Sequence, residues 1–211
     1  MFKRSFLVLL SLLIVSPAGA VMAQSDPALV GWWKFDETSG TTARDSSGKG
    51  PDIEMVNTTW EEGFIGGAVH FHGEGYGRDT SFSFSENAIT LSTWVWHDAF
   101  VAGQVERYVT IGPEVAVIRR NSDGRLHFYA TIGGTFSHIY IPDVLTEGEW
   151  RFVVGTWDGD TQRLYLDGEE IASLTPNGTL SGGSMVRLSS PDGEYLNGLL
   201  DDVRVYERAL S

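Results

Sequence analysis

Short apolar alternations separated by turn residues run through most of the chain. The clearest case is Trp150 to Ile171, where an aromatic and branched run meets Asp158-Gly159-Asp160 and a second run closes at Asp167-Gly168. Acidic–glycine turns between such runs are typical of β-hairpins, so this stretch predicts three antiparallel strands. Because Phe152, Val153 and Val154 are consecutive and apolar, the first strand is expected to be covered on both faces, inside its sheet.

The same spacing recurs along the chain, and no convincing amphipathic helix follows the first 23 residues. A dozen short strands in fewer than 200 residues predict an all-β fold, a two-sheet antiparallel β-sandwich. Two stretches rich in small polar residues and glycine, Asp36 to Glu54 and Gly73 to Glu86, are predicted to be loops. The predicted strands are Leu29 to Phe35, Ala68 to His72, Ile89 to His97, Tyr108 to Ile111, Val115 to Arg119, Arg125 to Thr131, Phe136 to Ile141, Trp150 to Trp157, Arg163 to Leu166, Glu170 to Leu174, Met185 to Leu188 and Leu200 to Tyr206.

Five segments in a fixed order resemble a known family. They are LVGWWKFDETSGTTARDSSGKG (Leu29 to Gly50), GGAVHFHG (Gly66 to Gly73), ITLSTWVW (Ile89 to Trp96), the Trp150 to Ile171 stretch, and NGLLDDVRVYERALS (Asn197 to Ser211). Together they are similar to bacterial LamG-type domains of the laminin-G-like, concanavalin A-like lectin-glucanase superfamily. The resemblance implies a concanavalin A-like jelly roll over nearly all of the chain after residue 23.

The N-terminus has the pattern of an export signal. Lys3 and Arg4 precede the apolar run Phe6 to Val15, and Val21-Met22-Ala23 resembles a cleavage site. The apolar run is short for a membrane-spanning helix. We therefore expect residues 1–23 to be a signal peptide, residues 24–211 to form one domain, and the protein to be secreted, extracellular or periplasmic.

The net charge and the cysteine content limit which classes of partner and of metal site are expected. The formal charge is −13, and cleavage after Ala23 would move it to −15. Such a balance disfavours nucleic acid and anionic membrane surfaces as partners. The absence of cysteine excludes disulfides, thiolate metal sites and cysteine nucleophiles, so we expect packing, aided by a bound metal, to supply stability.

Acidic residues near the two ends of the chain suggest a calcium site. Asp201 is predicted to share a strand face with Val203 and Val205, an unfavourable place for a carboxylate. Asp36 follows the first strand, and Asp45, Ser46 and Ser47 lie in the polar loop after it. These oxygens suit Ca²⁺, and LDDVRVY resembles the end strand of laminarinase-type hydrolases, whose Asp binds a structural Ca²⁺. That match falls on Asp201; an ion pair with Arg44 or Arg204 is the alternative.

A second group of residues suggests a ligand-binding face. Alternation places six aromatic residues opposite the core positions of their strands: His70, His72, His127, Tyr129, His138 and Tyr140. Sugar rings combine apolar C–H faces with hydroxyl groups, so aromatic side chains beside hydrogen-bonding groups favour a glycan or polysaccharide as ligand. The alternatives are a half-buried pleated surface with no ligand, and a Zn²⁺ or Cu²⁺ site formed by the histidines.

The sequence gives little support for catalysis. Hydrolases that the end strand resembles carry E-x-D-x-E or E-x-D-x-x-E on one strand, and no Glu here is followed two positions later by Asp. No G-x-S-x-G elbow is present. We therefore predict a non-catalytic, carbohydrate-binding, lectin-like module with structural calcium. A polysaccharide-active glycoside hydrolase and an adhesion module that binds an extracellular protein remain the alternatives.

Overall fold

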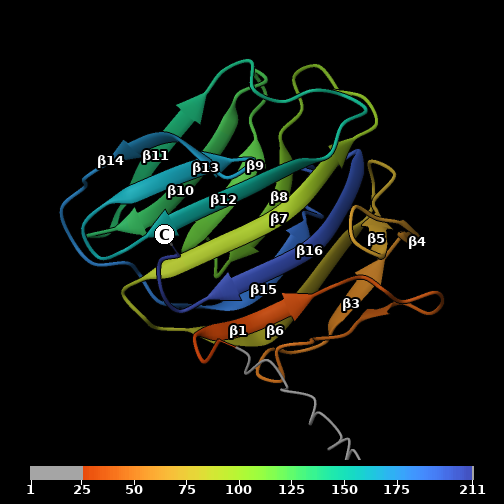
Figure 1. The fold of residues 1–211 in the computed structure, drawn as a ribbon, viewed down its shortest axis with the longest axis horizontal. Coiled ribbons are helices and arrows are strands. Elements are labelled where there is room, and N and C mark those ends of the chain that lie inside the picture. Colours follow the sequence, from red (N-terminus) through yellow and green to blue (C-terminus); the bar gives the residue numbers. More distant parts are fainter. Residues whose placement is uncertain (1–25, 211) are drawn as a thin grey trace, which may run out of the picture.

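Two antiparallel sheets of eight strands each face one another across a shared apolar core, which confirms the predicted sandwich (Figure 1). The structure is a computed structural model that describes residues 26–210. The predicted signal peptide therefore lies outside the described residues. Between residues 26 and 210 there are strands but no helix, and so no helix long and apolar enough to span a membrane.

The first sheet lies in front in Figure 1 and has the order β14-β13-β12-β7-β16-β5-β4, with β1 also pairing with β16. Its strands are β1 (Leu29–Trp33), β4 (Thr59–Glu62), β5 (Gly67–His70), β7 (Ile89–His97), β12 (Arg151–Trp157), β13 (Gln162–Leu166), β14 (Glu169–Leu174) and β16 (Gly198–Tyr206). The second sheet has the order β11-β10-β9-β8-β15-β6-β3-β2. Its strands are β2 (Thr42–Ala43), β3 (Ile53–Val56), β6 (Tyr76–Phe84), β8 (Glu106–Ile111), β9 (Ala116–Arg120), β10 (Leu126–Ile132), β11 (Thr135–Ile141) and β15 (Gly183–Ser189).

The first and last strands are neighbours. β1 pairs antiparallel with β16, with Leu29 opposite Tyr206 and Trp33 opposite Val203. Trp33 is fully buried and packs edge-on against Phe82 of the second sheet, with ring centroids 6.4 Å apart. The two ends of the domain thus close one side of the same core.

The core also holds charged and polar side chains between the two sheets. Arg120 of β9 donates to the Glu106 carboxylate at 3.1 Å, and the Tyr108 hydroxyl lies 3.0 Å from Nε2 of His97. All four are buried. Burial, together with the Arg120 charge, lowers the pKa of His97 to about 3, so the imidazole is neutral.

The prediction that Gly73 to Glu86 is a loop is wrong, because β6 covers most of it. Phe82 and Phe84 are buried, but the rest of the strand is made of Tyr, Gly, Arg, Asp, Thr and Ser. Gly77 occupies a position where an apolar side chain would have revealed the period-two pattern of a strand. No side chain fits there, because a Cβ on Gly77 would lie 2.5 Å from the Met55 sulfur. Close packing of β3 on a glycine therefore hides this strand from the hydrophobic pattern.

The polar stretch Asp36 to Glu54 is mostly a loop, as predicted, and Asp45 holds it in place. The Asp45 carboxylate accepts N–H bonds from Trp32, Ser47, Gly48, Lys49 and Gly50. These contacts tie the loop to β1. Asp45 thus anchors this loop through hydrogen bonds to the backbone.

Candidate functional site

Five aromatic side chains gather on the outer face of the second sheet, where β10 pairs with β11. The register places His127 opposite Tyr140, Tyr129 opposite His138 and Thr131 opposite Phe136. Leu126, Phe128 and Ala130 of β10 point into the core, so the alternate residues share the outer face. We call His127, Tyr129, Phe136, His138 and Tyr140 the aromatic ladder.

The ladder has a buried and an exposed layer. His127 and Tyr129 are buried, whereas Phe136 is 54% exposed and Tyr140 38% exposed. Tyr140 stacks on His127 with ring centroids 4.0 Å apart, and Phe136 meets the Tyr129 ring edge-on at 5.7 Å. The surfaces open to a ligand are thus those of β11, and Tyr129 supports them from below.

Hydrogen bonds fix the imidazoles of the ladder. Arg119 Nε donates to His127 Nδ1 at 3.0 Å, which places the His127 proton on Nε2, 3.0 Å from His138 Nδ1. Burial and the Arg119 charge lower the pKa of His127 to about 3 and also lower the pKa of His138. Both rings are therefore held neutral and in one orientation.

A charged group adjoins the ladder along β8 and β9. Arg107 donates to Glu114 at 2.8 Å and to Glu194, and Arg119 also contacts Glu194 at 3.4 Å. The Tyr129 hydroxyl donates to Glu114 at 2.8 Å and so links the ladder to the charges. Although burial raises the pKa of Glu114, hydrogen bonds from Arg107 and Tyr129 hold it below its ordinary value. Glu114 is thus an ionised acceptor, unsuited to donate a proton.

A small hollow of about 180 Å³ opens beside this charged group, lined by Arg107, Thr110, Glu114, Met185 and Arg187 among others. Sequence reasoning missed these polar residues. Arg107 and Arg119 are paired across β8 and β9, a register that alternation within one strand does not reveal. Glu114 and Glu194 lie in loops, which no apolar period places.

His70 and His72, predicted to belong to the same binding face, lie elsewhere. His70 ends β5 of the first sheet, where it is opposite Leu199 of β16. His72 follows β5, and the two imidazoles are neighbours, with ring centroids 3.8 Å apart. The six predicted residues therefore form two separate groups, because β5 and the pair β10–β11 belong to different sheets.

Asp201 is buried, but the prediction that it shares a strand face with Val203 and Val205 is wrong. It pairs with Trp94, whereas Val205 pairs with Leu91 of the core face, and the register shifts between Asp201 and Arg204. Asp202, with φ of 51°, is the extra residue of this bulge. The bulge turns Asp201 to the face opposite Val203 and Val205.

A loop between β4 and β5 covers Asp201 and also contacts Asp36. One Asp201 oxygen accepts the Ile65 N–H at 2.7 Å, whereas the other is buried and has no hydrogen-bond partner within residues 26–210. Burial, and then the charge of Asp202, raises the pKa of Asp201 to about 6. Asp36 accepts the Gly67 N–H at 2.9 Å, and a Cβ on Gly66 would lie 2.3 Å from the same oxygen. The two predicted calcium ligands thus share one loop, and the unpartnered oxygen fits a cation ligand.

The alternative ion pair of Asp201 with Arg44 or Arg204 does not occur among the described side chains. Arg204 pairs instead with Asp202 at 2.8 Å, and Asp202 also accepts the indole N–H of Trp32 at 2.5 Å. The neighbouring carboxylate, not Asp201, is therefore the one neutralised by an arginine.

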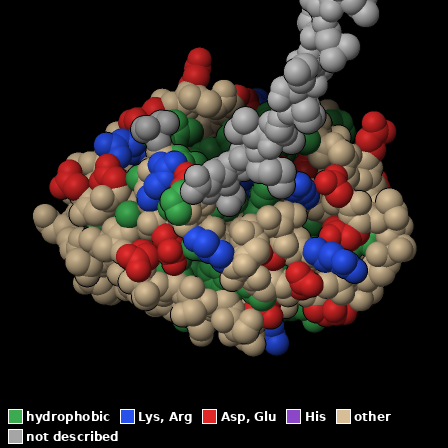
Figure 2. Space-filling view, turned by 60° about the horizontal axis from the view of Figure 1, so that its bottom comes forward, with side chains coloured by type: hydrophobic (Ala, Val, Ile, Leu, Met, Phe, Trp, Pro, Cys, Tyr) green, Lys and Arg blue, Asp and Glu red, His purple; other side chains and the backbone are tan. Residues whose placement is uncertain are grey.

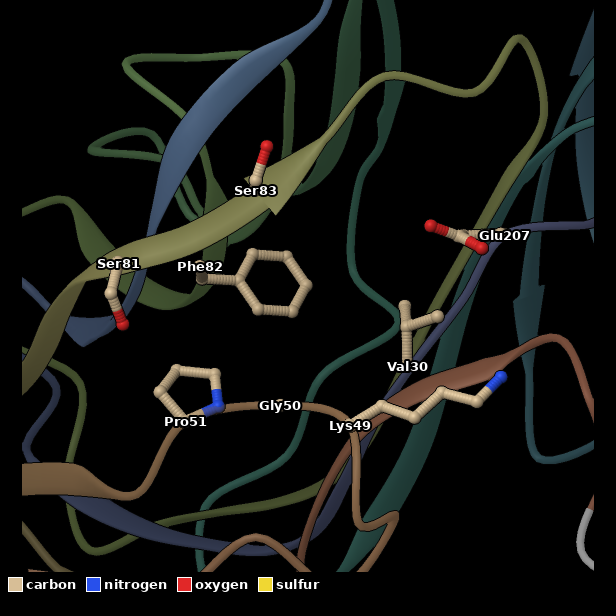
Figure 3. Close-up of a pocket in the computed structure, with 8 residues that line it drawn as sticks. All are labelled: Val30, Lys49, Gly50, Pro51, Ser81, Phe82, Ser83 and Glu207. Atoms are coloured by element: carbon tan, nitrogen blue, oxygen red, sulfur yellow. The ribbon is translucent and has the colours of Figure 1, made fainter.

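A larger hollow, about 500 Å³, lies at one end of the sandwich between β1 and β6 (Figure 3). Phe82 points into it from β6, while Lys49, Gly50 and Pro51 form its opposite wall. Phe82 is only 5% exposed. Figure 2, in which the bottom of the Figure 1 view comes forward, shows acidic and basic side chains interspersed over the visible face. Phe82 is the one aromatic residue among the described residues that line this hollow, and it is buried, so the ladder is the better candidate for sugar binding.

Comparisons with known proteins agree with this architecture. A family model described as the concanavalin A-like lectin/glucanases superfamily matches residues 71–211. Among curated proteins, no sequence matches this chain.

Solved structures extend the likeness over most of the domain. One is domain 4 of AbnA, a GH43 extracellular arabinanase from Geobacillus stearothermophilus, in complex with arabinotriose. It is 19% identical to this chain with a TM-score of 0.68, and the match covers 87% of this chain and 94% of that one. The binding domain of botulinum neurotoxin DC, in complex with rat synaptotagmin II, is 14% identical with a TM-score of 0.67. The match covers 87% of this chain and 49% of that one. Botulinum neurotoxin type C, whose cell entry is described as dependent upon interaction with two ganglioside molecules, is 15% identical with a TM-score of 0.67, and the match covers 87% of this chain and 49% of that one. This chain thus spans about half of the toxin chains, and at these identities the likeness establishes a shared fold alone.

Proposed function

Since this chain belongs to the concanavalin A-like lectin/glucanase superfamily, we propose that it is a non-catalytic module that binds carbohydrate on the outer face of its second sheet. The observation that carries the proposal is the exposed pair Phe136 and Tyr140 beside the hydrogen-bonding group of Arg107, Glu114 and Glu194. Sugars bound by structural neighbours, arabinotriose among them, support it.

Each half of this face supplies one part of sugar recognition. The exposed rings offer apolar surface for the C–H face of a pyranose or furanose. Arginine donors and carboxylate acceptors, already oriented by their mutual ion pairs, match hydroxyl groups, which both donate and accept. Because the buried layer fixes the rings above it, a ligand would lose little affinity to side-chain ordering.

Replacing Tyr140 with Ala should weaken glycan binding by about 1 to 3 kcal/mol, because an exposed ring surface is lost while the core is untouched. A glycan array with and without calcium identifies the sugar, and calorimetry then compares wild type and variant. Tyr165→Ala is the matched control, since Tyr165 is half-buried on the first sheet.

Equal losses for the two tyrosine variants, or full binding by Tyr140→Ala, would contradict the assignment of this face. Release of reducing sugar from a polysaccharide panel would instead favour the hydrolase alternative. Capture of an extracellular protein that persists after deglycosylation, without any array signal, would favour the adhesion alternative.

Calcium binding at Asp201, with Asp36 and backbone carbonyls nearby, is a further part of the proposal. The unpartnered buried oxygen of Asp201 supports it. A metal that binds only the folded state stabilises by RT ln(1 + [L]/Kd), so 1 mM calcium over a site of about 10 µM would add about 2.7 kcal/mol. The corresponding rise in melting temperature is about 5 to 10 °C.

Differential scanning calorimetry in EDTA and in calcium measures this shift. Asp201→Asn keeps the shape of the side chain and should abolish most of the calcium response. Asp45→Asn is a comparison variant that should melt earlier under both conditions but keep the response, because Asp45 anchors a loop. Equal melting of wild type with and without calcium would exclude the site.

Export completes the proposal, on the pattern of the first 23 residues. N-terminal sequencing of the exported protein should begin at or near Gln24. An intact Met1 on the protein would contradict cleavage.

A further inference from the structure

Two histidines and a carboxylate converge at the β4–β5 hairpin of the first sheet, away from the aromatic ladder. Glu61 of β4, His70 at the end of β5 and His72 each offer a ligand atom, and these atoms all lie within 4.8 Å of one another. Among residues 26–210 this is the one such group of three or more histidine or acidic side chains. We propose that Glu61, His70 and His72 form a binding site for a divalent transition-metal ion of the Zn²⁺ class.

The hairpin brings the three side chains together. Thr59 pairs with His70 and Glu61 with Ala68, so Glu61 and His70 are diagonal neighbours across the two strands. His72 has φ of 50° and Gly73 has φ of 74°, a left-handed pair that ends the extended chain. The His72 ring lies beside that of His70, closer than side chains two apart on a regular strand would be.

Distances within the group are close to those of a metal site. Glu61 Oε1 lies 2.7 Å from His70 Nδ1. Ligands about 2.0 to 2.1 Å from a tetrahedral zinc ion are separated by about 3.3 Å, so a small outward rotation of the exposed Glu61 side chain would admit the ion. Two imidazoles and one carboxylate, with room for water or a ligand in the fourth position, favour zinc, cobalt, nickel or copper over calcium.

Asp98 provides the second, independent observation. Its Oδ2 lies 2.7 Å from His70 Nε2, the ring nitrogen that faces away from Glu61. Metal-bound histidines usually donate their other ring N–H to a carboxylate, which orients the ring and makes it a better ligand. The Glu61–His70–Asp98 arrangement has this form, with His70 13% exposed at its centre.

The alternative is a metal-free ion pair. Both nitrogens of His70 contact a carboxylate, a pairing that Glu61 and Asp98 could make with His70 alone. His72 separates the two accounts. Its Nε2 contacts Thr59 Oγ1 at 2.8 Å, and the ion pairs within residues 26–210 join His70 to Glu61 and Asp98 without His72, so an ion pair alone does not require it.

The site is accessible from solvent. Glu61 borders two hollows, one of about 540 Å³ beside Asp36 and Trp60 and one of about 250 Å³ beside Asp98, Trp96 and Trp150. The Glu61 side chain is 43% exposed. A metal ion held there would therefore keep a coordination position open to water or to a ligand donor.

Co²⁺ titration of the untagged full chain tests the proposal, because cobalt reports its geometry by visible absorption. We expect one equivalent of Co²⁺ to give tetrahedral or five-coordinate bands, and Zn²⁺ to displace it. His72→Gln should abolish the bands, and Asp98→Asn should weaken binding by about 10- to 100-fold. His138→Gln, which alters the histidine pair of the ladder, should leave the titration unchanged.

Absence of saturable Co²⁺ and Zn²⁺ binding at 100 µM metal, or a His72→Gln spectrum equal to that of wild type, would overturn the site. Bands lost in His138→Gln instead would assign the metal to the ladder. Circular dichroism without metal establishes that each variant is folded. Glycan binding by the ladder does not enter this test, so the two proposals can fail separately.

Discussion

Replacing Arg120 with Met should lower the free energy of unfolding by about 3 to 5 kcal/mol, since it leaves the Glu106 carboxylate buried without its counter-charge. Both side chains lie between the sheets, and Arg120 also packs over Phe100 at 4.2 Å, a contact that methionine can keep. The Asn197 N–H, 3.2 Å from Glu106, would be the main remaining donor. We expect the melting temperature to fall by about 6 to 20 °C.

A double-mutant cycle separates loss of the pair from loss of packing. Glu106→Gln keeps an acceptor for Asn197 and carries no charge, so Glu106→Gln/Arg120→Met should lose less stability than Arg120→Met alone. Burial already raises the pKa of Glu106. The unpaired carboxyl group should therefore take up a proton, and the loss from Arg120→Met should be smaller at pH 5 than at pH 8. A loss below 1 kcal/mol at pH 8 would show that the pair is not needed.

Acid should destabilise the calcium-free protein through two buried histidines. The pKa values of His97 and His127 are about 3 in the folded protein, against an ordinary value of 6.5. The unfolded chain then binds more protons between those limits, so stability is present above pH 6.5 and declines as the pH falls toward 3. From pH 7 to 4.5 the two residues together would cost about 5 kcal/mol.

Asp201 opposes this trend. Its folded pKa, about 6, exceeds the ordinary 3.8, so the folded state binds the extra proton and gains about 2 kcal/mol over the same interval. For these three groups taken together the loss is about 3 kcal/mol, or about 6 to 12 °C in melting temperature. Calcium should reverse the sign of the Asp201 contribution, because it binds the ionised carboxylate.

Melting curves in EDTA from pH 7 to 4.5 measure the change in stability. Histidine NMR resonances, followed in parallel, report the protonation of the two buried histidines. The His97 and His127 signals should not titrate above pH 4.5 while the protein is folded. His127→Gln should flatten the pH dependence and Asp201→Asn should steepen it. A melting temperature independent of pH in this range would contradict the buried neutral histidines.

The sequence predicts those strands in which apolar and polar side chains alternate with little interruption. The hairpins of β12, β13 and β14 were predictable, because Leu164 and Leu166 alternate with polar residues between acidic–glycine turns. β6 was not, because its inward positions include glycine. Asp201 was predicted to be buried for the wrong reason, since a bulge at Asp202 reverses the alternation on which the argument depended.

For the site, period-two alternation was enough to group His127, Tyr129, His138 and Tyr140, because β10 and β11 are adjacent in sequence and in space. It could not separate them from His70 and His72, since sheet membership is a long-range property. It also could not show that Tyr129 is buried beneath Phe136, or that Arg107 and Glu114 complete the face. Those contacts arise from strand order and loop conformation.

The pairing of the first strand with the last has a mechanical consequence. Leu29 at the start of β1 faces Tyr206 at the end of β16, and the Arg208–Asp26 ion pair lies just outside them. A pulling force applied at these two points would act across the hydrogen bonds and open them one after another, from Leu29 toward Trp33. Strands loaded in this unzipping direction resist force less than strands sheared along their length, so β1 should detach first, exposing the buried Trp33 indole as a fluorescence reporter of tension.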